Sequence, residues 1–327
     1  MGIRVGVAGT GRLGREHVRV LGGIDGVEAV ACYDVDRTRA ESAAGAFGAR
    51  ACPSLEEMIS EVDAVCVVVP TTHHARVASL ALEAGRDVFV EKPLARSSAE
   101  AADLVARAEA ARVVLQVGHV ERFNGAVQAA AARVGRPSFV EIHRLAPFRV
   151  RGTDVSVVGD LMIHDLDLLG YLVGEWPAEV RAKGASILTP GFDIVNARLE
   201  FPGGCVANVT ASRVTVAPMR KVRVFSPDGY LSIDLLAGVA RHYRRAPDFD
   251  AKLARLREGD EASAQLLDFI EIETIASDGV EPLRKELEAF CRCVATRETP
   301  PVTGRDGLAA VRLAEEVLAR ASERAAS

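Results

Sequence analysis

Residues 3–14 read IRVGVAGTGRLG, an apolar run followed by a glycine-rich turn. The run Ile3 to Ala8 has the character of a buried strand, and a helical pattern continues beyond the turn. Gly9, Gly11 and Gly14 allow a tight turn, close approach of the backbone to a pyrophosphate and close packing of the helix. The stretch therefore predicts a dinucleotide-binding turn with the pyrophosphate at the helix N-terminus.

The same pattern of strand and helix repeats up to about residue 120. Four further apolar runs are expected to be strands: Ala29–Tyr33, Ala64–Val69, Asp87–Val90 and Val113–Val117. These runs are continuous rather than alternating, which is typical of parallel strands covered on both faces. We therefore expect an α/β fold with a Rossmann-type doubly wound parallel sheet, and we assign residues 1–121 to an NAD-binding domain.

After about residue 180 the apolar pattern becomes alternating. In Val195 to Phe201 every second residue is apolar, and the turn Ser226-Pro227-Asp228-Gly229 joins two alternating runs into a hairpin. Strands with one polar face indicate an antiparallel sheet. Because helical patterns return at 283–296 and 306–324, we expect residues 122–327 to form an α+β domain with an open, mostly antiparallel sheet.

The composition is that of a globular protein of about two domains. Of 327 residues, 49% are hydrophobic and 26% are charged. A net charge of −5 provides no basic field for nucleic acid, and the apolar run Ala64–Val69 is too short to span a membrane. The six cysteines show neither a CxxC pair nor a zinc spacing, which predicts free thiols, no metal and a cytoplasmic location.

Asp34 lies at the end of the second expected strand, twenty residues after Gly14. At this position a carboxylate accepts hydrogen bonds from the adenosine ribose hydroxyls. Its charge would also repel a 2′-phosphate, by about 4 kcal/mol for each pair of unit charges 4 Å apart. The sequence therefore predicts NAD rather than NADP as cofactor, and the alternative is a glycine turn that binds no ligand.

Two segments carry groups suited to acid–base chemistry. Lys92 follows the fourth strand, where an ammonium group can stabilise a developing alkoxide, although a solvated Glu91–Lys92 pair is the alternative. Asp160, His164 and Asp167 share one face of a predicted helix, so a carboxylate can orient the imidazole. A structural histidine or a metal pair would show the same spacing, but no third metal ligand is evident.

Two other groups of residues have less specific patterns. His73 and His74 follow the third strand, where a structural or capping role is the default for each. Residues 133–151 carry a local charge of +4 from Arg133, Arg136, Arg144, Arg149 and Arg151 against Glu141. Guanidinium groups suit phosphate oxygens, and a solvated basic surface is the alternative.

These motifs occur in the order typical of one family. GxGxxG and Asp34 are followed by PTTHHARVASLALEAGRDVFVEKPL, by DLMIHDLD and by PLRKELEAFCRCVATRETPPVTGRDGLAAVRLAEEV. Over nearly its whole length the chain resembles the glucose–fructose oxidoreductase / inositol dehydrogenase (Gfo/Idh/MocA) family. The resemblance implies an NAD(P)-dependent oxidoreductase acting on a sugar or cyclitol hydroxyl. It also implies that residues 122–327 bind the substrate and form a homodimer or homotetramer through the open sheet.

The resemblance also implies roles for individual residues. Lys92 would hydrogen-bond the reacting hydroxyl and the nicotinamide ribose, His164 would be the general base, and Asp160 would hold His164 or the substrate. The cofactor would contact Gly9, Thr10, Gly11, Arg12, Leu13, Gly14, Asp34, Val69, Pro70, His74, Glu91 and Lys92. Met162 departs from the family, many members of which have glycine two residues before the histidine. A side chain there is expected to narrow the pocket or change which hydroxyl is presented.

Within the family, VGHVERFN at 117–124 and RGTDVSVVGDLMIHDLDLL at 151–169 are most similar to the nucleotide-sugar branch. This similarity implies oxidation of the 3-hydroxyl of UDP-N-acetylglucosamine, which gives a keto intermediate for the 3-amino sugars of lipid A. The expected substrate contacts are Arg122, Asn124, Arg151, Asp160 and His164. The alternatives are a free-sugar or inositol dehydrogenase, an NAD-dependent glycosidase and a non-catalytic nucleotide sensor.

Overall fold

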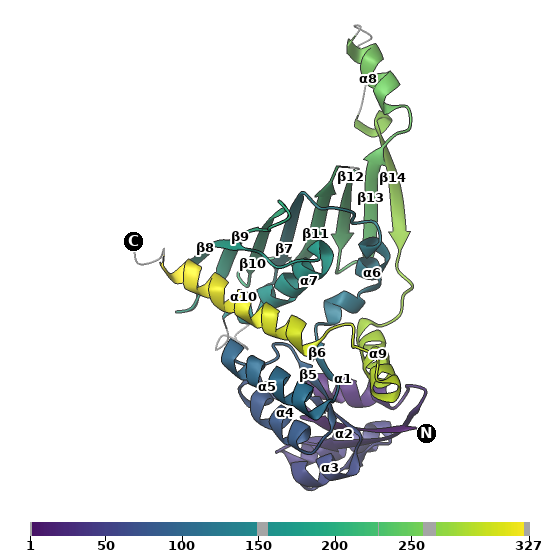
Figure 1. The fold of residues 1–327 in the computed structure, drawn as a ribbon, viewed down its shortest axis with the longest axis vertical. Coiled ribbons are helices and arrows are strands. Elements are labelled where there is room, and N and C mark those ends of the chain that lie inside the picture. Colours follow the sequence, from purple (N-terminus) through teal and green to yellow (C-terminus); the bar gives the residue numbers. More distant parts are fainter. Residues whose placement is uncertain (1, 149–155, 228, 258–265, 324–327) are drawn as a thin grey trace. The chain divides into compact units, whose positions relative to one another are not determined.

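The computed structural model describes residues 2–148, 156–227, 229–257 and 266–323, which form two compact units. The first unit comprises residues 1–123 and 280–316, and the second comprises 124–279 and 317–327 (Figure 1). The chain passes from the first unit to the second after residue 123, close to the boundary expected after residue 121. Residues 280–316, which were expected in the second domain, belong to the first unit. The reason is helix α9, Pro282–Thr296, whose apolar residues Leu287 and Phe290 belong to the core of the first unit.

The first unit is built on a six-stranded parallel sheet in the order β3-β2-β1-β4-β5-β6. Its strands are β1 Ile3–Ala8, β2 Val27–Tyr33, β3 Arg50–Ala51, β4 Ala64–Val67, β5 Asp87–Glu91 and β6 Leu115–Gly118. Every residue of β4 and β5 is buried. This burial on two faces explains the continuous apolar runs and confirms the predicted doubly wound sheet.

Helices connect and cover these strands. They are α1 Arg12–Leu21, α2 Arg37–Phe47, α3 Leu55–Glu61, α4 His74–Glu83, α5 Ser98–Ala111 and the later α9. The last helix, α10 Gly304–Glu323, belongs to the first unit up to Glu316 and to the second from Val317. Ser54 and Ser97 start α3 and α5, since each hydroxyl accepts a hydrogen bond from the amide three residues on. Across the described residues, no helix is long and apolar enough to cross a membrane.

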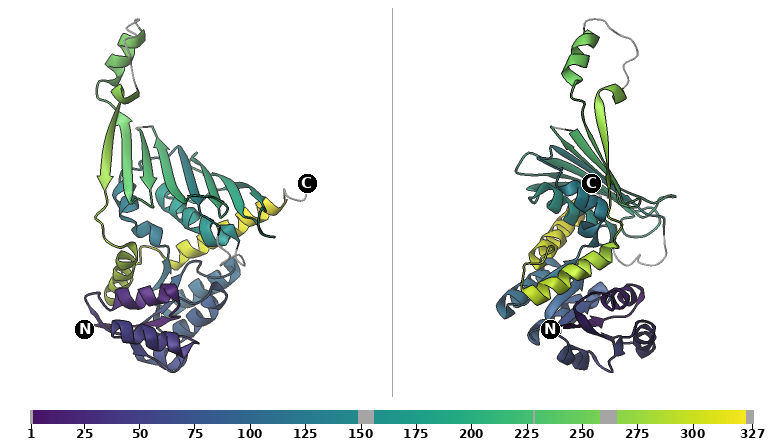
Figure 2. Two further views of the ribbon diagram at one scale, coloured as in Figure 1. Left: turned by 180° about the vertical axis from the view of Figure 1, so that it is seen from behind. Right: turned by 90° about the vertical axis from the view of Figure 1, so that its right-hand side faces the viewer.

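The second unit is built on an eight-stranded sheet in the order β14-β13-β12-β11-β7-β10-β9-β8. Only β7 and β10 pair in parallel, which confirms a mostly antiparallel sheet. The strands are β7 Phe139–Leu145, β8 Glu179–Ala185, β9 Ile194–Glu200, β10 Val206–Ser212, β11 Met219–Ser226, β12 Gly229–Asp234, β13 Val239–Arg245 and β14 Ile270–Ala276. Its helices are α6 Gly125–Ala131, α7 Ile163–Val173 and α8 Phe249–Arg257. Figure 2 shows α8 at the far end of the β13–β14 hairpin.

A buried ion pair joins α7 to the sheet of the second unit. Arg144 on β7 donates two hydrogen bonds from Nε and one from Nη2 to the carboxylate of Asp165, at 2.8 to 2.9 Å. The two side chains are 3% and 1% exposed. Because a bidentate guanidinium–carboxylate pair has a fixed geometry, it sets the register of α7 against β7.

The loop between β8 and β9 folds around Asp193. Its buried carboxylate accepts hydrogen bonds from the amides of Ile187, Leu188 and Thr189 and from the Thr189 hydroxyl. Burial alone would raise the pKa of Asp193, but these hydrogen bonds outweigh it and lower the pKa to about 2.

We expect Asp193→Asn to lower the free energy of unfolding by about 2 kcal/mol at pH 7. The folded-state pKa lies below the ordinary value of 3.8, so this contribution is complete above that value and is lost as the pH falls towards about 2. Urea unfolding of both proteins at pH 7 and pH 3 measures the difference, which should shrink at the lower pH. An equal difference at both values would show that ionisation of Asp193 is not the source.

Candidate active site

A cavity of about 520 Å³ lies at the carboxyl ends of β1, β4 and β5 in the first unit. Ligands of open parallel sheets bind at this edge, outside the strand ends. Its walls come from the glycine turn, from the end of β2, from α4 and from the turn after β5. The lining residues are Ala8, Gly9, Gly11, Arg12, Leu13, Tyr33, Asp34, Val35, Arg39, Leu55, Val68, Val69, Pro70, Thr71, His73, His74, Arg76, Val77, Glu91 and Lys92.

The three glycines of the turn are required for three different reasons. Gly9 has a φ of +93°, and a Cβ there would lie 2.5 Å from the carbonyl oxygen of Val68. A Cβ on Gly14 would lie 1.8 Å from the Gly9 oxygen, so α1 packs against the turn only without one. Gly11, by contrast, has no atom within 4 Å of an ideal Cβ position, although it directly precedes α1. This open space before a helix N-terminus fits a dinucleotide pyrophosphate.

Asp34 is held by the turn that it faces. One carboxylate oxygen accepts a hydrogen bond from the amide of Thr10 at 2.7 Å, and the other accepts from the amide of Asp36 at 2.9 Å. The side chain therefore has a fixed position on the cavity wall. Arg39 lines the same wall, with its Nε 3.1 Å from a carboxylate oxygen of Asp36.

Val69, Pro70 and Lys92 line the opposite wall, and His74 connects the segments that carry them. The His74 ring lies 2.7 Å through Nδ1 from the Pro93 oxygen and 2.9 Å through Nε2 from the Val69 oxygen. Burial lowers the pKa of His74, against the opposite effect of the two carbonyl groups. His74 lines the cavity while both of its ring nitrogens contact the protein backbone, and its cofactor contact stays a prediction.

Most of the predicted cofactor residues thus meet in one cavity, and Thr10 and Gly14 lie directly behind it. Sequence reasoning missed several lining residues, among them Val35, Arg39, Leu55 and Arg76. Val35 and Arg39 were detectable in principle, because they follow Asp34 by one and five positions. Leu55 and Arg76 reach the cavity only through the positions of α3 and α4, for which the sequence carries no motif.

Asp160 and His164 belong to the second unit. Asp160 lies in a π-helical turn, Val158–Met162, in which the amide of Ile163 bonds to the oxygen of Val158 five residues earlier. His164 follows in α7, and both side chains are half-buried, whereas Asp167 is buried. The segment is thus not the uniform α-helix expected, and π-turns of this kind are frequent at functional sites. Met162 is fully buried in this unit, so its side chain packs in the core.

The predicted substrate residues have different environments. Arg122 is buried in the first unit, where it donates to the oxygen of Pro301 and lies 3.4 Å from a carboxylate oxygen of Asp306. Asn124 caps α6 by accepting from the amide of Ala126 and donates to the oxygen of Leu235. Both polar groups of its amide are therefore bonded within the protein. Arg151 lies outside the described residues.

Two arginines of residues 133–151, the segment expected to bind phosphate, are bound to acidic residues of the protein instead. Arg144 is bound to Asp165 inside the second unit. Arg133 donates to Glu273 at 2.9 Å. Because the pattern of charge does not reveal a distant acidic partner, the sequence alone overstated how much positive charge this segment offers.

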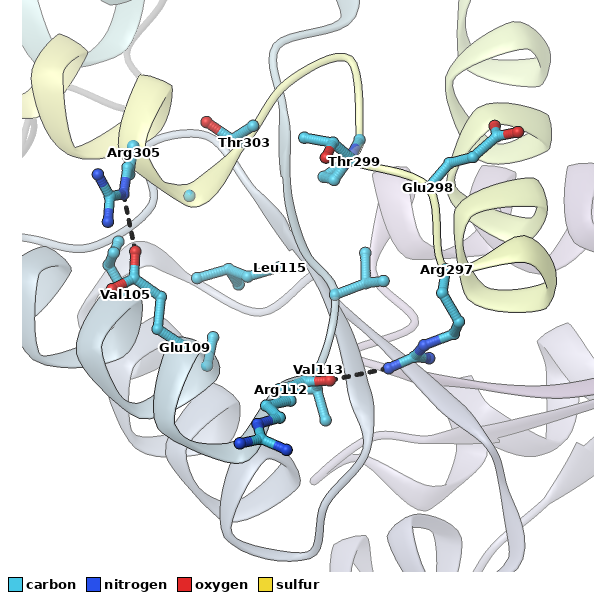
Figure 3. A pocket seen from close by; sticks show the side chains of 14 residues that line it. Val105, Glu109, Arg112, Val113, Leu115, Arg297, Glu298, Thr299, Thr303 and Arg305 are labelled. Atoms are coloured by element: carbon cyan, nitrogen blue, oxygen red, sulfur yellow. Dashed lines mark hydrogen bonds and ion pairs between the residues drawn. The ribbon is translucent and has the colours of Figure 1, made fainter.

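A second cavity of about 400 Å³ lies at the opposite edge of the first sheet, between the end of α5, the start of β6 and the α9–α10 connection. Figure 3 shows two of the arginines that line it bound to the protein: Arg305 donates to Glu109, and Arg297 donates to the oxygen of Arg112. Among the described residues, no group of three or more His, Cys, Asp or Glu side chains is arranged to hold a metal ion.

The glycine cradle, Asp34 and the lysine beside the same cavity define a Rossmann-type, NAD-binding oxidoreductase. Residues 3–119 match the model described as "Oxidoreductase family, NAD-binding Rossmann fold", and 121–232 match the "GFO/IDH/MocA C-terminal domain". The chain therefore belongs to the Gfo/Idh/MocA oxidoreductase family, as its motifs predicted.

Individual members of the family are similar to this chain over most of its length. UDP-N-acetylglucosamine 3-dehydrogenase from Acidithiobacillus ferrooxidans is 37% identical over 276 residues, covering 82% of this chain and 88% of the relative. A solved structure of a protein of that name and organism superposes with a TM-score of 0.89 at 33% identity, covering 99% of this chain and 98% of the other. Inositol 2-dehydrogenase from Rhizobium meliloti is 26% identical, covering 99% of this chain and 98% of the relative.

Proposed function

We propose that this oxidoreductase oxidises the 3-hydroxyl of UDP-N-acetylglucosamine, with NAD as the hydride acceptor. The observation that carries the proposal is the likeness in both sequence and fold to UDP-N-acetylglucosamine 3-dehydrogenase. The cradle of Gly9, Gly11 and Gly14 supports the choice of a dinucleotide, and the fixed carboxylate of Asp34 supports NAD over NADP.

The proposed mechanism assigns three tasks to residues of this chain. His164 takes the proton of the sugar hydroxyl, and Asp160 holds His164 or the substrate. Lys92 donates a hydrogen bond to the same hydroxyl oxygen, which stabilises negative charge as the proton leaves. When bound in the cavity, NAD supplies the nicotinamide ring that accepts the carbinol hydride. The carbinol thus loses one proton to His164 and one hydride, which carries the two electrons, to NAD.

The proposal is tested by following NADH absorbance with purified protein and NAD. UDP-N-acetylglucosamine is compared with free N-acetylglucosamine, inositol and glucose, and an aminotransferase with its amine donor traps the keto product. We expect NADH only with the nucleotide sugar. Turnover of a free polyol instead would overturn the proposal and favour the inositol dehydrogenases, to which the chain is also similar. Release of free sugar without net NADH would favour the glycosidase alternative.

The cofactor preference is tested at Asp34. Asp34→Asn removes the charge and keeps one oxygen for the Thr10 amide, at the cost of the hydrogen bond from the Asp36 amide. Loss of repulsion worth up to about 4 kcal/mol should reduce the ratio of kcat/KM for NAD over NADP by roughly 10²- to 10³-fold. Most of this change should appear as better use of NADP, because Arg39 already lines the same wall. An unchanged ratio would remove Asp34 as the discriminating residue.

We also propose that the second unit forms a homodimer or homotetramer through its sheet. Phe139, Phe225, Tyr230 and Tyr243 are register neighbours on four adjacent strands, and their rings lie 4.2 to 5.9 Å apart between centroids. They are half-exposed and alternate with residues buried on the other face. A half-exposed aromatic row of this length supports a docking surface for a second copy.

Light scattering on a size-exclusion column measures the assembly. We expect a dimer or tetramer for the native chain and a smaller species for Tyr230→Glu, because a charge in the aromatic row would have to be buried. A native chain that elutes as a monomer at micromolar concentration would contradict the proposed assembly.

A further inference from the structure

We propose that two buried histidines, His17 and His74, position the turn that carries Lys92 and thereby set where its ammonium group lies. This inference rests on the proposed function, in which Lys92 contacts the reacting hydroxyl. His17 and His74 are then positioning residues, which act through Glu91 and through the turn that carries Lys92. Three features of the first unit support this inference: the contact of His17 with Glu91, the glycine at position 118 and the contacts of His74.

The first observation is a buried contact on the strand side of the turn. The carboxylate of Glu91, at the end of β5, lies 2.9 Å from Nε2 of His17 on α1. The other carboxylate oxygen accepts the backbone amide of Lys92 at 3.2 Å. His17 is fully buried, and its Nδ1 has no hydrogen-bond partner among the described residues. Because a carboxylate oxygen accepts, Nε2 of His17 donates to Glu91.

The second observation is the space reserved for that carboxylate. A Cβ on Gly118, at the end of β6, would lie 3.0 Å from Cδ and Oε2 of Glu91 and equally close to Cζ of Phe89. The missing side chain allows Glu91 to fit between β6 and α1. Its position is thus determined by His17 on one side and by the bare backbone of Gly118 on the other.

The third observation is the contact on the far side of Lys92. The His74 ring lies between the backbone oxygens of Pro93 and Val69, at 2.7 and 2.9 Å. These oxygens belong to the turn after β5 and to the segment after β4, both of which border the cofactor cavity. A neutral ring donates to one of these oxygens and only packs against the other, whereas a protonated ring hydrogen-bonds both segments. Glu91 raises the pKa of His74, and Lys92 lowers it.

Together these contacts hold the residues before and after Lys92, which itself lines the cavity. A lysine has four rotatable side-chain bonds, so its reach is defined only if its backbone is fixed. Displacement of a catalytic group by about 1 Å can reduce a rate by about 10²-fold. Placing the turn is therefore a catalytic requirement that Lys92 alone cannot meet.

The decisive experiment is a double-mutant cycle between His17 and Lys92. We expect His17→Leu to lower kcat by about 10- to 100-fold, with the dissociation constant of NAD changed by less than about threefold. In a Lys92→Met background the same substitution should have little further effect on kcat, because its effect passes through Lys92. Equal losses of kcat in both backgrounds would overturn the inference.

Two variants keep the test informative if His17→Leu folds poorly. His17→Gln retains an amide donor for Glu91 and should recover most of kcat. Gly118→Ala leaves every bonding group in place but crowds the Glu91 carboxylate, and it should lower kcat only when Lys92 is present. As a matched control, Val18→Ala removes a buried neighbour of His17 in the same helix. Any loss of kcat from this control should be the same with and without Lys92.

An activity-independent readout completes the test. The rate at which an amine-reactive reagent labels Lys92, followed by mass spectrometry, should change in His17→Leu and return towards the native value in His17→Gln. Labelling at Lys285, in α9, provides the internal reference. If Lys92→Met alone leaves turnover unchanged, the assigned role of Lys92 fails. If that variant is impaired but labelling does not respond to His17, only the present inference fails.

Discussion

Replacing His164 with alanine is expected to lower kcat by on the order of 10²- to 10⁴-fold, the range typical of a lost general base. The loss arises because no group then accepts the hydroxyl proton as the hydride leaves. The affinity for NAD should be unchanged, because the residues of the cofactor cavity all belong to the first unit. Initial rates of NADH formation and calorimetric NAD titration measure the two quantities separately.

The control for this prediction is His143→Ala. His143 lies on β7 of the same unit, in a half-exposed position on the sheet face that carries Phe139. It should leave kcat within about twofold of the native value. If His164→Ala retained native turnover across the pH range, His164 would not be the base.

The second large effect concerns the buried pair that anchors α7. Arg144→Met removes the guanidinium from a carboxylate that is only 1% exposed, and we expect the second unit to lose about 3 to 5 kcal/mol of stability. The charge of Asp165 remains in the interior without those hydrogen bonds. The single tryptophan, Trp176, packs against Gly170 of α7, so its fluorescence during urea unfolding reports on this unit.

The double variant Arg144→Met with Asp165→Leu separates the charge effect from the packing effect. Because both charges are removed together, its stability should return close to that of the native protein. If the single and double variants were equally unstable, packing around Arg144 rather than the buried charge would be responsible. Both variants should also be assayed for kcat, since α7 carries His164.

Much of the fold was predictable because local patterns and tertiary packing agree. The strands of the first unit are continuous apolar runs because both of their faces are buried. The strand β3 and the helix α3 were missed, since a two-residue strand has no periodicity and LEEMISE is short and strongly charged. The return of α9 to the first unit follows from which core receives Leu287 and Phe290, and no local pattern encodes that choice.

In the site, too, local motifs were predictable and contacts between distant residues were not. A motif located the cofactor cavity, because its glycines and Asp34 perform their roles within one continuous turn. The contact of His17 with Glu91 joins residues 74 positions apart and has no sequence signal of its own. The π-turn at Val158–Met162 was also not predictable, because its residues fit an α-helix equally well. The arrangement of Lys92 relative to His164 and Asp160 stays a prediction.

In the proposed reaction, hydride leaves C3 of UDP-N-acetylglucosamine. The most direct measurement uses UDP-N-acetylglucosamine deuterated at C3, with NAD and the trapping aminotransferase, followed by mass spectrometry of the reduced cofactor. We expect the deuterium to be recovered at C4 of the nicotinamide ring and to be lost from the trapped sugar. Reduced cofactor without deuterium, or a sugar that keeps its label during turnover, would contradict the proposed reaction.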